Sequence, residues 1–142
     1  MLRMHGLHLM ADLRDCGRGC PRGASAMTDP AALRRLCLGA VAAAQLTPVG
    51  ELFHRFADAG GVTGVVLLAE SHLAVHTWPE LGAVTLDVYV CNFGGDNTAK
   101  AERLLADLEQ AFGAQATTRH RVLRGEAAVA TEAAPAPAKE GV

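Results

Sequence analysis

Three short apolar runs that follow one another in the middle of the chain constrain its fold most strongly. They cover residues 62–69, 73–77 and 83–91, are rich in β-branched or apolar side chains, and are each bounded by polar or breaker residues. Runs of this length and composition are typical of β-strands. Pro79 lies between the second and third runs and cannot continue a central strand, so the chain must turn there. The sequence therefore predicts several antiparallel strands in succession.

The segments before these runs predict a strand, a loop, a helix and an extended segment. In "HGLHLMADL" every second side chain is apolar, which is typical of a half-buried strand. Residues 14–27 are rich in glycine and breakers, and we interpret them as a loop. Asp29 and Pro30 stand at the N-cap and first position of a helix, and residues 47–56 look extended. The helix has an apolar stripe that would face a sheet: Leu33, Leu36, Cys37, Ala40, Val41 and Ala44.

The C-terminal part of the chain predicts a second helix, a last strand and a tail. The helix covers "DNTAKAERLLADLEQAFG", with capping residues at 96–98 and Gly113 just after its end. Residues 115–123 are a predicted strand, and residues 126–142 have no periodicity and are predicted to be disordered. The buried stripe of the second helix consists of Ala101, Leu104, Leu105, Leu108 and Phe112.

This order of elements favours one domain over residues 1–125, with an α+β fold. The economical packing is a two-layer sandwich in which two helices cover one face of a mainly antiparallel sheet. The other face of the sheet then needs a cover, which a partner subunit would supply.

Composition excludes some partners. Half of the residues are hydrophobic and the formal net charge is −2, so nothing attracts the chain as a whole to nucleic acid or to an anionic membrane. No apolar window approaches the ~18 residues of a membrane-spanning helix. The first residues lack the apolar core of a secretion signal, so we expect a cytoplasmic protein with reduced thiols. The four cysteines form no metal-binding pattern.

Polar groups interrupt the apolar region within "LLAESHLAVHTWPE". Ser71 falls between two strands, at a predicted bend, and His72 and His76 share one face of a strand because side chains repeat every two residues. Taken singly, each is consistent with an ordinary role: a serine at a turn, or histidines at a sheet edge. A zinc site formed by His72, His76 and Cys91 is an alternative, although it lacks a fourth ligand.

Taken together, these residues resemble a known family. "GVTGVVLLAESHLAVHTWPELG", followed by "LDVYVC", is similar to the small prokaryotic S-adenosylmethionine decarboxylases, which make their own pyruvoyl cofactor. "HLMADL" near the start, "FHRF" at residues 53–56 and the helix spacing are also similar, so the likeness covers residues 4–124.

The resemblance implies that the chain cuts itself between Glu70 and Ser71, into a β chain of residues 1–70 and an α chain of residues 71–142. The Ser71 hydroxyl would attack the Glu70 carbonyl, and elimination with loss of ammonia would leave a pyruvoyl group at residue 71. By the same resemblance His76 assists this processing. A nearby hydroxyl also helps, supplied here by Thr63 where the family commonly has serine.

The resemblance also implies the roles of three residues in the mature enzyme. The pyruvoyl carbonyl forms a Schiff base with the substrate amine and takes up the electrons that decarboxylation leaves behind. Cys91 would return the proton, and a thiol is a plausible donor at neutral pH. Glu80 would hold the ribose hydroxyls, and Phe56 would stack on the adenine or serve as an ordinary core residue.

Some positions depart from the family pattern and keep the substrate open. Leu81 stands where the family often has tyrosine, Asn92 where it has glycine, and "NFGGDNTAKAE" differs from the usual stretch. The resemblance implies S-adenosylmethionine decarboxylation for spermidine synthesis, in a homodimer of cleaved protomers with its active sites near the interface. The alternatives are an ornithine or arginine decarboxylase with the same cofactor, and an unprocessed homologue that only binds a ligand or partner.

Overall fold

The computed structural model of the protein describes residues 5–58 and 60–125. The predicted tail at 126–142 lies outside the described residues. The elements, in chain order, are β1 (His5–Arg14), α1 (Pro21–Ala26), α2 (Pro30–Ala43), β2 (Pro48–Arg55), β3 (Val62–Leu68), β4 (Ser71–Trp78), the 3₁₀ helix η1 (Pro79–Leu81), β5 (Ala83–Cys91), α3 (Thr98–Phe112) and β6 (Ala116–Gly125).

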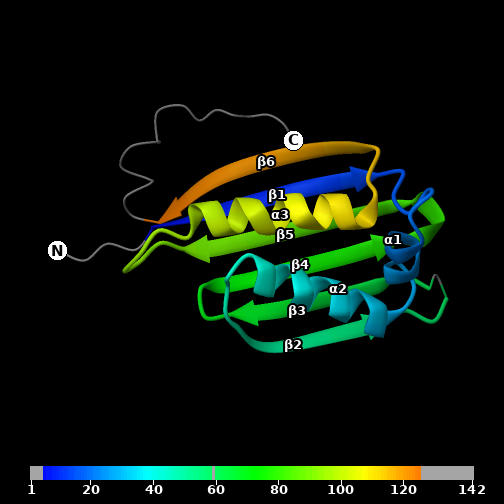
Figure 1. Ribbon diagram of the computed structural model, residues 1–142, viewed down its shortest axis with the longest axis horizontal. Helices are drawn as coiled ribbons and strands as arrows, with labels where there is room; N and C mark the ends of the chain where they lie inside the picture. Colours follow the sequence, from blue (N-terminus) through cyan, green and yellow to red (C-terminus); the bar gives the residue numbers. More distant parts are fainter. Residues whose placement is uncertain (1–4, 59, 126–142) are drawn as a thin grey trace.

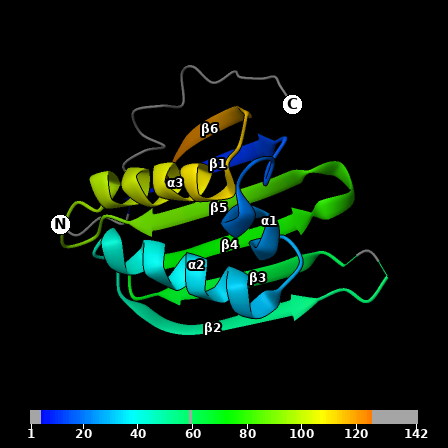
Figure 2. The same ribbon diagram turned by 45° about the vertical axis from the view of Figure 1, so that its right-hand side comes forward.

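The six strands form one antiparallel sheet in the order β2-β3-β4-β5-β1-β6. In Figures 1 and 2 all three helices lie on the same side of this sheet, with α2 crossing the β2–β4 half and α3 the β5–β1–β6 half. The predicted two-layer α+β sandwich is therefore confirmed. Because both long helices cover the same face, the opposite face of the sheet is left without a helix.

In β1, an inner strand of the sheet, the alternation of apolar and polar side chains determines which side chains face the helices. Leu7, Leu9, Ala11 and Leu13 are buried against the helices, as the alternation predicts. This strand pairs with β5 on one side and with β6 on the other. The N-terminal strand therefore lies between two strands from the second half of the chain.

The two long helices begin and end where the sequence predicts. The Asp29 carboxylate accepts a hydrogen bond from the Ala31 N–H at 3.0 Å, and Pro30 occupies the first helical position of α2. Gly113 ends α3 with a φ of 67°, a conformation that glycine adopts at low cost. The predicted stripe of α3 is confirmed, because its five named residues are buried. In the predicted stripe of α2, Ala40 is only half-buried, and the other five residues are buried: Leu33, Leu36, Cys37, Val41 and Ala44.

The prediction of a loop over residues 14–27 is wrong, because this segment contains the short helix α1. Two of its glycines, Gly17 and Gly23, contact Phe112 at the end of α3. A Cβ on Gly23 would lie 2.7 Å from the Phe112 carbonyl oxygen, so only glycine lets α1 approach the end of α3 this closely. The Gly17 N–H also donates to that carbonyl, at 2.8 Å.

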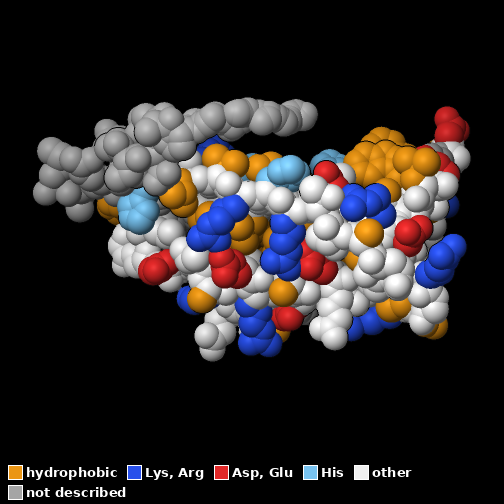
Figure 3. All heavy atoms as spheres, turned by 90° about the horizontal axis from the view of Figure 1, so that it is seen from above, with side chains coloured by type: hydrophobic (Ala, Val, Ile, Leu, Met, Phe, Trp, Pro, Cys, Tyr) orange, Lys and Arg blue, Asp and Glu red, His pale blue; other side chains and the backbone are white. Residues whose placement is uncertain are grey.

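The outer side of α3 and β6 is polar. Arg119 forms an ion pair with Glu109 at 2.7 Å, and Arg121 pairs with Glu102. In Figure 3 blue and red side chains alternate across the middle of this side of the molecule, whereas hydrophobic side chains and histidines follow its upper margin. Among the described residues, no helix is long and apolar enough to cross a membrane.

Candidate active site

The β3–β4 hairpin places Ser71 in a strained conformation. Leu68 pairs with Ser71, so only Ala69 and Glu70 make the turn between the two strands. Two-residue hairpin turns favour glycine and asparagine, because their central residues need positive φ. Here the strain falls on Ser71, which has a φ of 148°, a value that residues with a side chain rarely adopt. The predicted bend at Ser71 is thus present.

The peptide between Glu70 and Ser71 is held from both sides. The Glu70 carbonyl accepts a hydrogen bond of 2.8 Å from the backbone N–H of Cys91, at the end of β5. The Glu70 carboxylate accepts two hydrogen bonds from Thr47, from its N–H at 3.0 Å and from its hydroxyl at 3.1 Å. This carbonyl is therefore polarised by a donor that points at its oxygen.

Cys91 is positioned by the loop that follows it. The Phe93 N–H lies 3.4 Å from the Cys91 sulfur, and the Asn97 side chain donates to the Cys91 carbonyl at 2.9 Å. The loop is itself closed by the Asn97 N–H, which donates to the Asn92 side chain at 2.7 Å. The backbone of Cys91 therefore lies beside the Glu70–Ser71 peptide, and its thiol is held by a loop whose sequence departs from the resembled family at Asn92. We call Glu70, Ser71 and Cys91 the cleavage group.

A second group of predicted residues surrounds a cavity of about 490 Å³. The Thr63 hydroxyl and His76 Nδ1 lie 3.0 Å apart on adjacent strands, β3 and β4. Phe56, which is 48% exposed, and Glu80 also line the cavity. We call these four residues the pocket group. Sequence reasoning missed the other lining residues, although two of them, Ala57 and Thr77, lie next to predicted ones in the chain: Ala57, Asp58, Gly61, Thr77 and Trp78.

The cleavage group and the pocket group lie at opposite ends of β4. Ser71 and His76 are five residues apart on one extended strand, which separates their Cα atoms by roughly 16 Å. One copy of the chain therefore does not bring the His76 ring to the Ser71 hydroxyl. The structure brings Glu70 and Ser71 together with Cys91, and it brings Thr63 and His76 together with Phe56 and Glu80.

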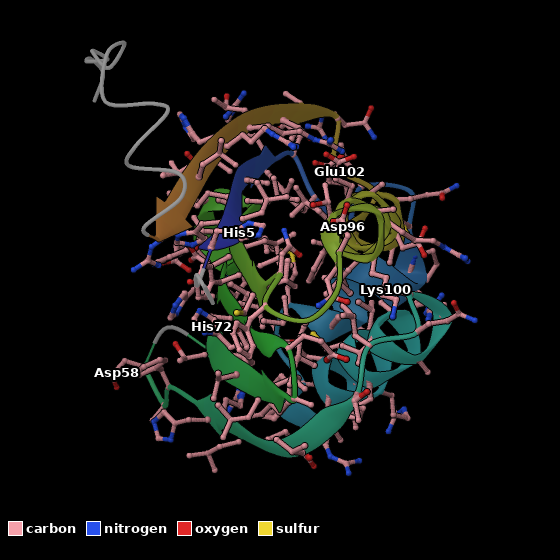
Figure 4. The ribbon with its side chains drawn as sticks, turned by 90° about the vertical axis from the view of Figure 1, so that its left-hand side faces the viewer. His5, Asp58, His72, Asp96, Lys100 and Glu102 are labelled. Carbon is pink, nitrogen blue, oxygen red and sulfur yellow. The ribbon has the colours of Figure 1, made fainter. Side chains whose placement is uncertain are left out.

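Charged and aromatic side chains lie on the uncovered face beside the cleavage group. His8 Nε2 lies 3.0 Å from the Asp87 carboxylate, and the Arg124 guanidinium lies 4.6 Å from the centre of the Tyr89 ring. Partial burial lowers the pKa of His72, as do His8 and Arg124, while Asp87 acts in the opposite direction. Figure 4 looks at this end of the molecule, with His5 and His72 on the sheet and Asp96, Lys100 and Glu102 at the start of α3.

The zinc alternative finds no support in the part of the chain that the structure describes. Nowhere within it do three His, Cys, Asp or Glu side chains lie close enough to hold a metal ion. His72 and His76 share a face of β4 but are four residues apart along it, or roughly 13 Å.

Fold and site together define a class of protein: an α+β sandwich that carries a strained Glu-Ser turn at one end of its sheet and a His- and Glu-lined cavity at the other. Comparison with known proteins identifies the family. The model of the S-adenosylmethionine decarboxylase family matches residues 7–125, and the chain belongs to this family.

Relatives and a solved structure agree with this assignment. S-adenosylmethionine decarboxylase proenzymes of Aquifex aeolicus (strain VF5) and Acidithiobacillus ferrooxidans (strain ATCC 53993 / BNL-5-31) are 43% and 36% identical over 91 and 125 residues, or 64% and 88% of this chain. The alignments cover 62% and 86% of those relatives. Several alignments, including that with the Aquifex aeolicus relative, thus span less than two thirds of the relative's length. The crystal structure of the adenosylmethionine decarboxylase from Aquifex aeolicus VF5 superimposes with a TM-score of 0.75 at 35% identity, covering 87% of this chain and 93% of that chain.

Proposed function

We propose that this chain is a proenzyme that cuts its own Glu70–Ser71 peptide and then decarboxylates S-adenosylmethionine. The observation that carries the proposal is the strained Ser71 beside a Glu70 carbonyl that accepts the Cys91 N–H. Membership of the S-adenosylmethionine decarboxylase family supports the substrate. The cut would divide the single domain, residues 1–125, and its tail into chains of residues 1–70 and 71–142.

The geometry at Glu70 suits the first step of self-cleavage. The Ser71 hydroxyl attacks the Glu70 carbonyl carbon, the amide C–N bond breaks, and an ester forms in its place. Negative charge develops on the Glu70 oxygen during this attack, and the Cys91 N–H already donates to that atom at 2.8 Å. A donor placed in advance where charge develops lowers the barrier of such a reaction. Relief of the strain at Ser71 acts in the same direction.

In the mature enzyme, the pyruvoyl group derived from Ser71 supplies the electron sink that decarboxylation requires. Cys91, next to residue 71, returns a proton to the carbon that has lost its carboxylate. The cavity of the pocket group accepts the nucleoside, with the Phe56 ring against the base and the Glu80 carboxylate on the ribose hydroxyls. Two carboxylate oxygens match the two hydroxyls of a vicinal diol.

We further propose that a complete site forms between two copies of the chain. The cleavage group and the pocket group are too far apart on β4 to act on one small molecule. In a dimer with two-fold symmetry, the cleavage group of one copy faces the pocket group of the other, twice. Large apolar side chains on β2, β3 and β4 support this arrangement, because they are exposed in one copy: Val49, Leu52, Leu67 and Trp78.

The deciding experiment is a mass measurement of the purified protein, followed by product analysis. We expect two chains divided before Ser71, with the second chain blocked at its N-terminus and reactive towards borohydride. Carbon dioxide should then be released from S-adenosylmethionine and not from ornithine or arginine. Release from either amino acid would replace the substrate, and one intact chain without a reactive carbonyl would favour the unprocessed homologue.

Other aspects of the proposal concern the surroundings. We propose a cytoplasmic enzyme with a small-molecule substrate and without a nucleic-acid partner, in line with the net charge of −2. The four cysteines lie among the described residues as free thiols.

A further inference from the structure

Thr47 makes three hydrogen bonds to the two residues of the cleavage turn, although it is more than twenty residues away in sequence. Its carbonyl accepts the Ala69 N–H at 2.8 Å. Its N–H and hydroxyl donate to the two oxygens of the Glu70 carboxylate, at 3.0 and 3.1 Å. None of the steps described so far uses this residue, which lies between α2 and β2.

The sequence fixes the backbone of Thr47 locally. Pro48 follows it, and a residue before proline is restricted to extended conformations. The segment then enters β2, which pairs with β3, so the position of Thr47 is coupled to the hairpin that carries the turn. Because its backbone is restricted in this way, Thr47 can place its N–H, its hydroxyl and its carbonyl against the turn at the same time.

The turn needs such a support. Neither Ala69 nor Glu70 is a residue type that favours a two-residue hairpin, and Ser71 carries a φ of 148°. A residue in a sparsely populated conformation stays there only when the structure around it holds it. The strand that follows the turn, β4, is held by its pairing with β3 and β5. Within the turn itself, the Glu70 side chain is held by its hydrogen bonds to Thr47.

We propose that Thr47 is a positioning residue for self-cleavage, which holds Glu70 so that its carbonyl stays on the Cys91 N–H while Ser71 stays strained. This inference rests on the proposed function, because it concerns the rate of the cut. Thr47 does not touch the reacting atoms, and it acts through the Glu70 carboxylate. In the first step, the Ser71 oxygen bonds to the Glu70 carbonyl carbon, the C–N bond breaks, and the hydroxyl proton ends on the freed nitrogen. The two chains separate in the next step, when residue 71 loses its α-proton and the Glu70 carboxylate leaves. Water then releases ammonia and leaves the pyruvoyl group, and Thr47 acts before these later steps.

The experiment compares the rate of cleavage in three forms of the full chain: wild type, Thr47→Val and Thr47→Ser. Each is synthesised without cells, and conversion of the full chain into its two fragments is followed on denaturing gels. Loss of the hydroxyl in T47V should slow cleavage about tenfold, the effect of one hydrogen bond to a charged group. T47S keeps the hydroxyl and should cleave within about twofold of wild type. Thr117→Val, at an exposed position in β6, is the matched control and should not change the rate.

Two further measurements separate positioning from a general loss of structure. In a Ser71→Ala background, which cannot cleave, adding T47V should leave the melting temperature nearly unchanged. Hydroxylamine cuts an ester but not an amide, so it should not restore cleavage in T47V, whose defect precedes the ester. If wild type is cleaved and T47V is cleaved at the same rate, the proposed role of Thr47 is wrong, whereas the proposed function still stands. An intact wild-type chain overturns the proposed function itself.

Discussion

Thr77, Thr63 and Ser71 show that hydroxyl side chains in this sheet have either a structural role or a place in the candidate site. Thr77 is buried, and its hydroxyl donates to the Met27 carbonyl at 2.7 Å and accepts from the Val62 N–H at 2.8 Å, so it joins the end of α1 to the sheet. Its hydrogen bonds are satisfied and unstrained. Ser71 instead has an unfavourable φ, and Thr63 lies with His76 on the cavity. Strain and access, rather than residue type, mark the residues expected to react.

The cysteines separate in the same way, and this gives a test by alkylation. Burial raises the pKa of Cys37 to about 12, and burial together with Asp15 raises that of Cys16 to about 11. A raised pKa keeps the unreactive thiol form until the pH approaches that value, so at pH 9 at most about 1% of either side chain is thiolate. Iodoacetamide should therefore modify Cys91 of the folded protein and leave Cys16 and Cys37 unmodified between pH 7 and pH 9, as peptide mass spectrometry would show.

The denatured protein is the control, because all four cysteines should then react. Modification of Cys37 in the folded protein as fast as Cys91 would contradict the buried environment that the structure gives it.

At the scale of elements, the sequence predicts what local patterns determine. Asp29 with Pro30, Gly113 and the alternation in β1 each act within a few residues, and the structure confirms them. Helix α1 was missed because its glycine allows contact with Phe112, a residue from the other end of the chain. In the site, the bend at Ser71 was predictable from the polar residues between two apolar runs. The contact of Thr47 with Glu70 was not, since it exists only once β2 and β3 have paired.

A glycine on β3, opposite Phe53 on β2, gives a prediction about stability. A Cβ on Gly64 would lie 2.1 Å from the ring of Phe53, its partner residue on β2. Gly64→Ala would force this ring off the core, and overpacking of this kind costs about 1–3 kcal/mol. We expect the free energy of unfolding in urea to fall by that amount.

Gly39→Ala is the matched control for this measurement. Gly39 lies within α2, and a Cβ there would meet nothing within 4 Å. Alanine favours a helix over glycine by about 0.5–1 kcal/mol, so this variant should be as stable as wild type or more so. Equal stability of G64A and wild type would show that Phe53 does not hold β2 in the way the structure indicates.

At the scale of the whole molecule, the proposed dimer accounts for two features at once: the sheet face that no helix of the described residues covers, and the division of the site into two groups. The helices leave one face of the sheet open, and that face carries exposed apolar side chains, Leu67 near the cleavage group and Trp78 near the pocket group. His8, His72 and Asp87 also lie near the cleavage group. In the dimer that we propose, a second copy on this face would cover both regions. The proposed dimer would also bring each half of the site to the half that it lacks, because roughly 16 Å separate Ser71 and His76 in a single copy.

This arrangement predicts complementation between two inactive variants. Ser71→Ala removes the hydroxyl that we propose reacts and keeps the pocket group, whereas His76→Ala removes the histidine that we propose assists processing and keeps the cleavage group. In a mixed dimer, the H76A chain meets the intact pocket group of the S71A chain, so its Ser71 regains everything required. With equal amounts of two differently tagged chains and random pairing, about half of the H76A chains should be cleaved, and no S71A chain. If the site were formed within one chain, the H76A chains would remain as uncut in the mixture as they are alone, and denaturing gels with tag-specific detection distinguish the two outcomes.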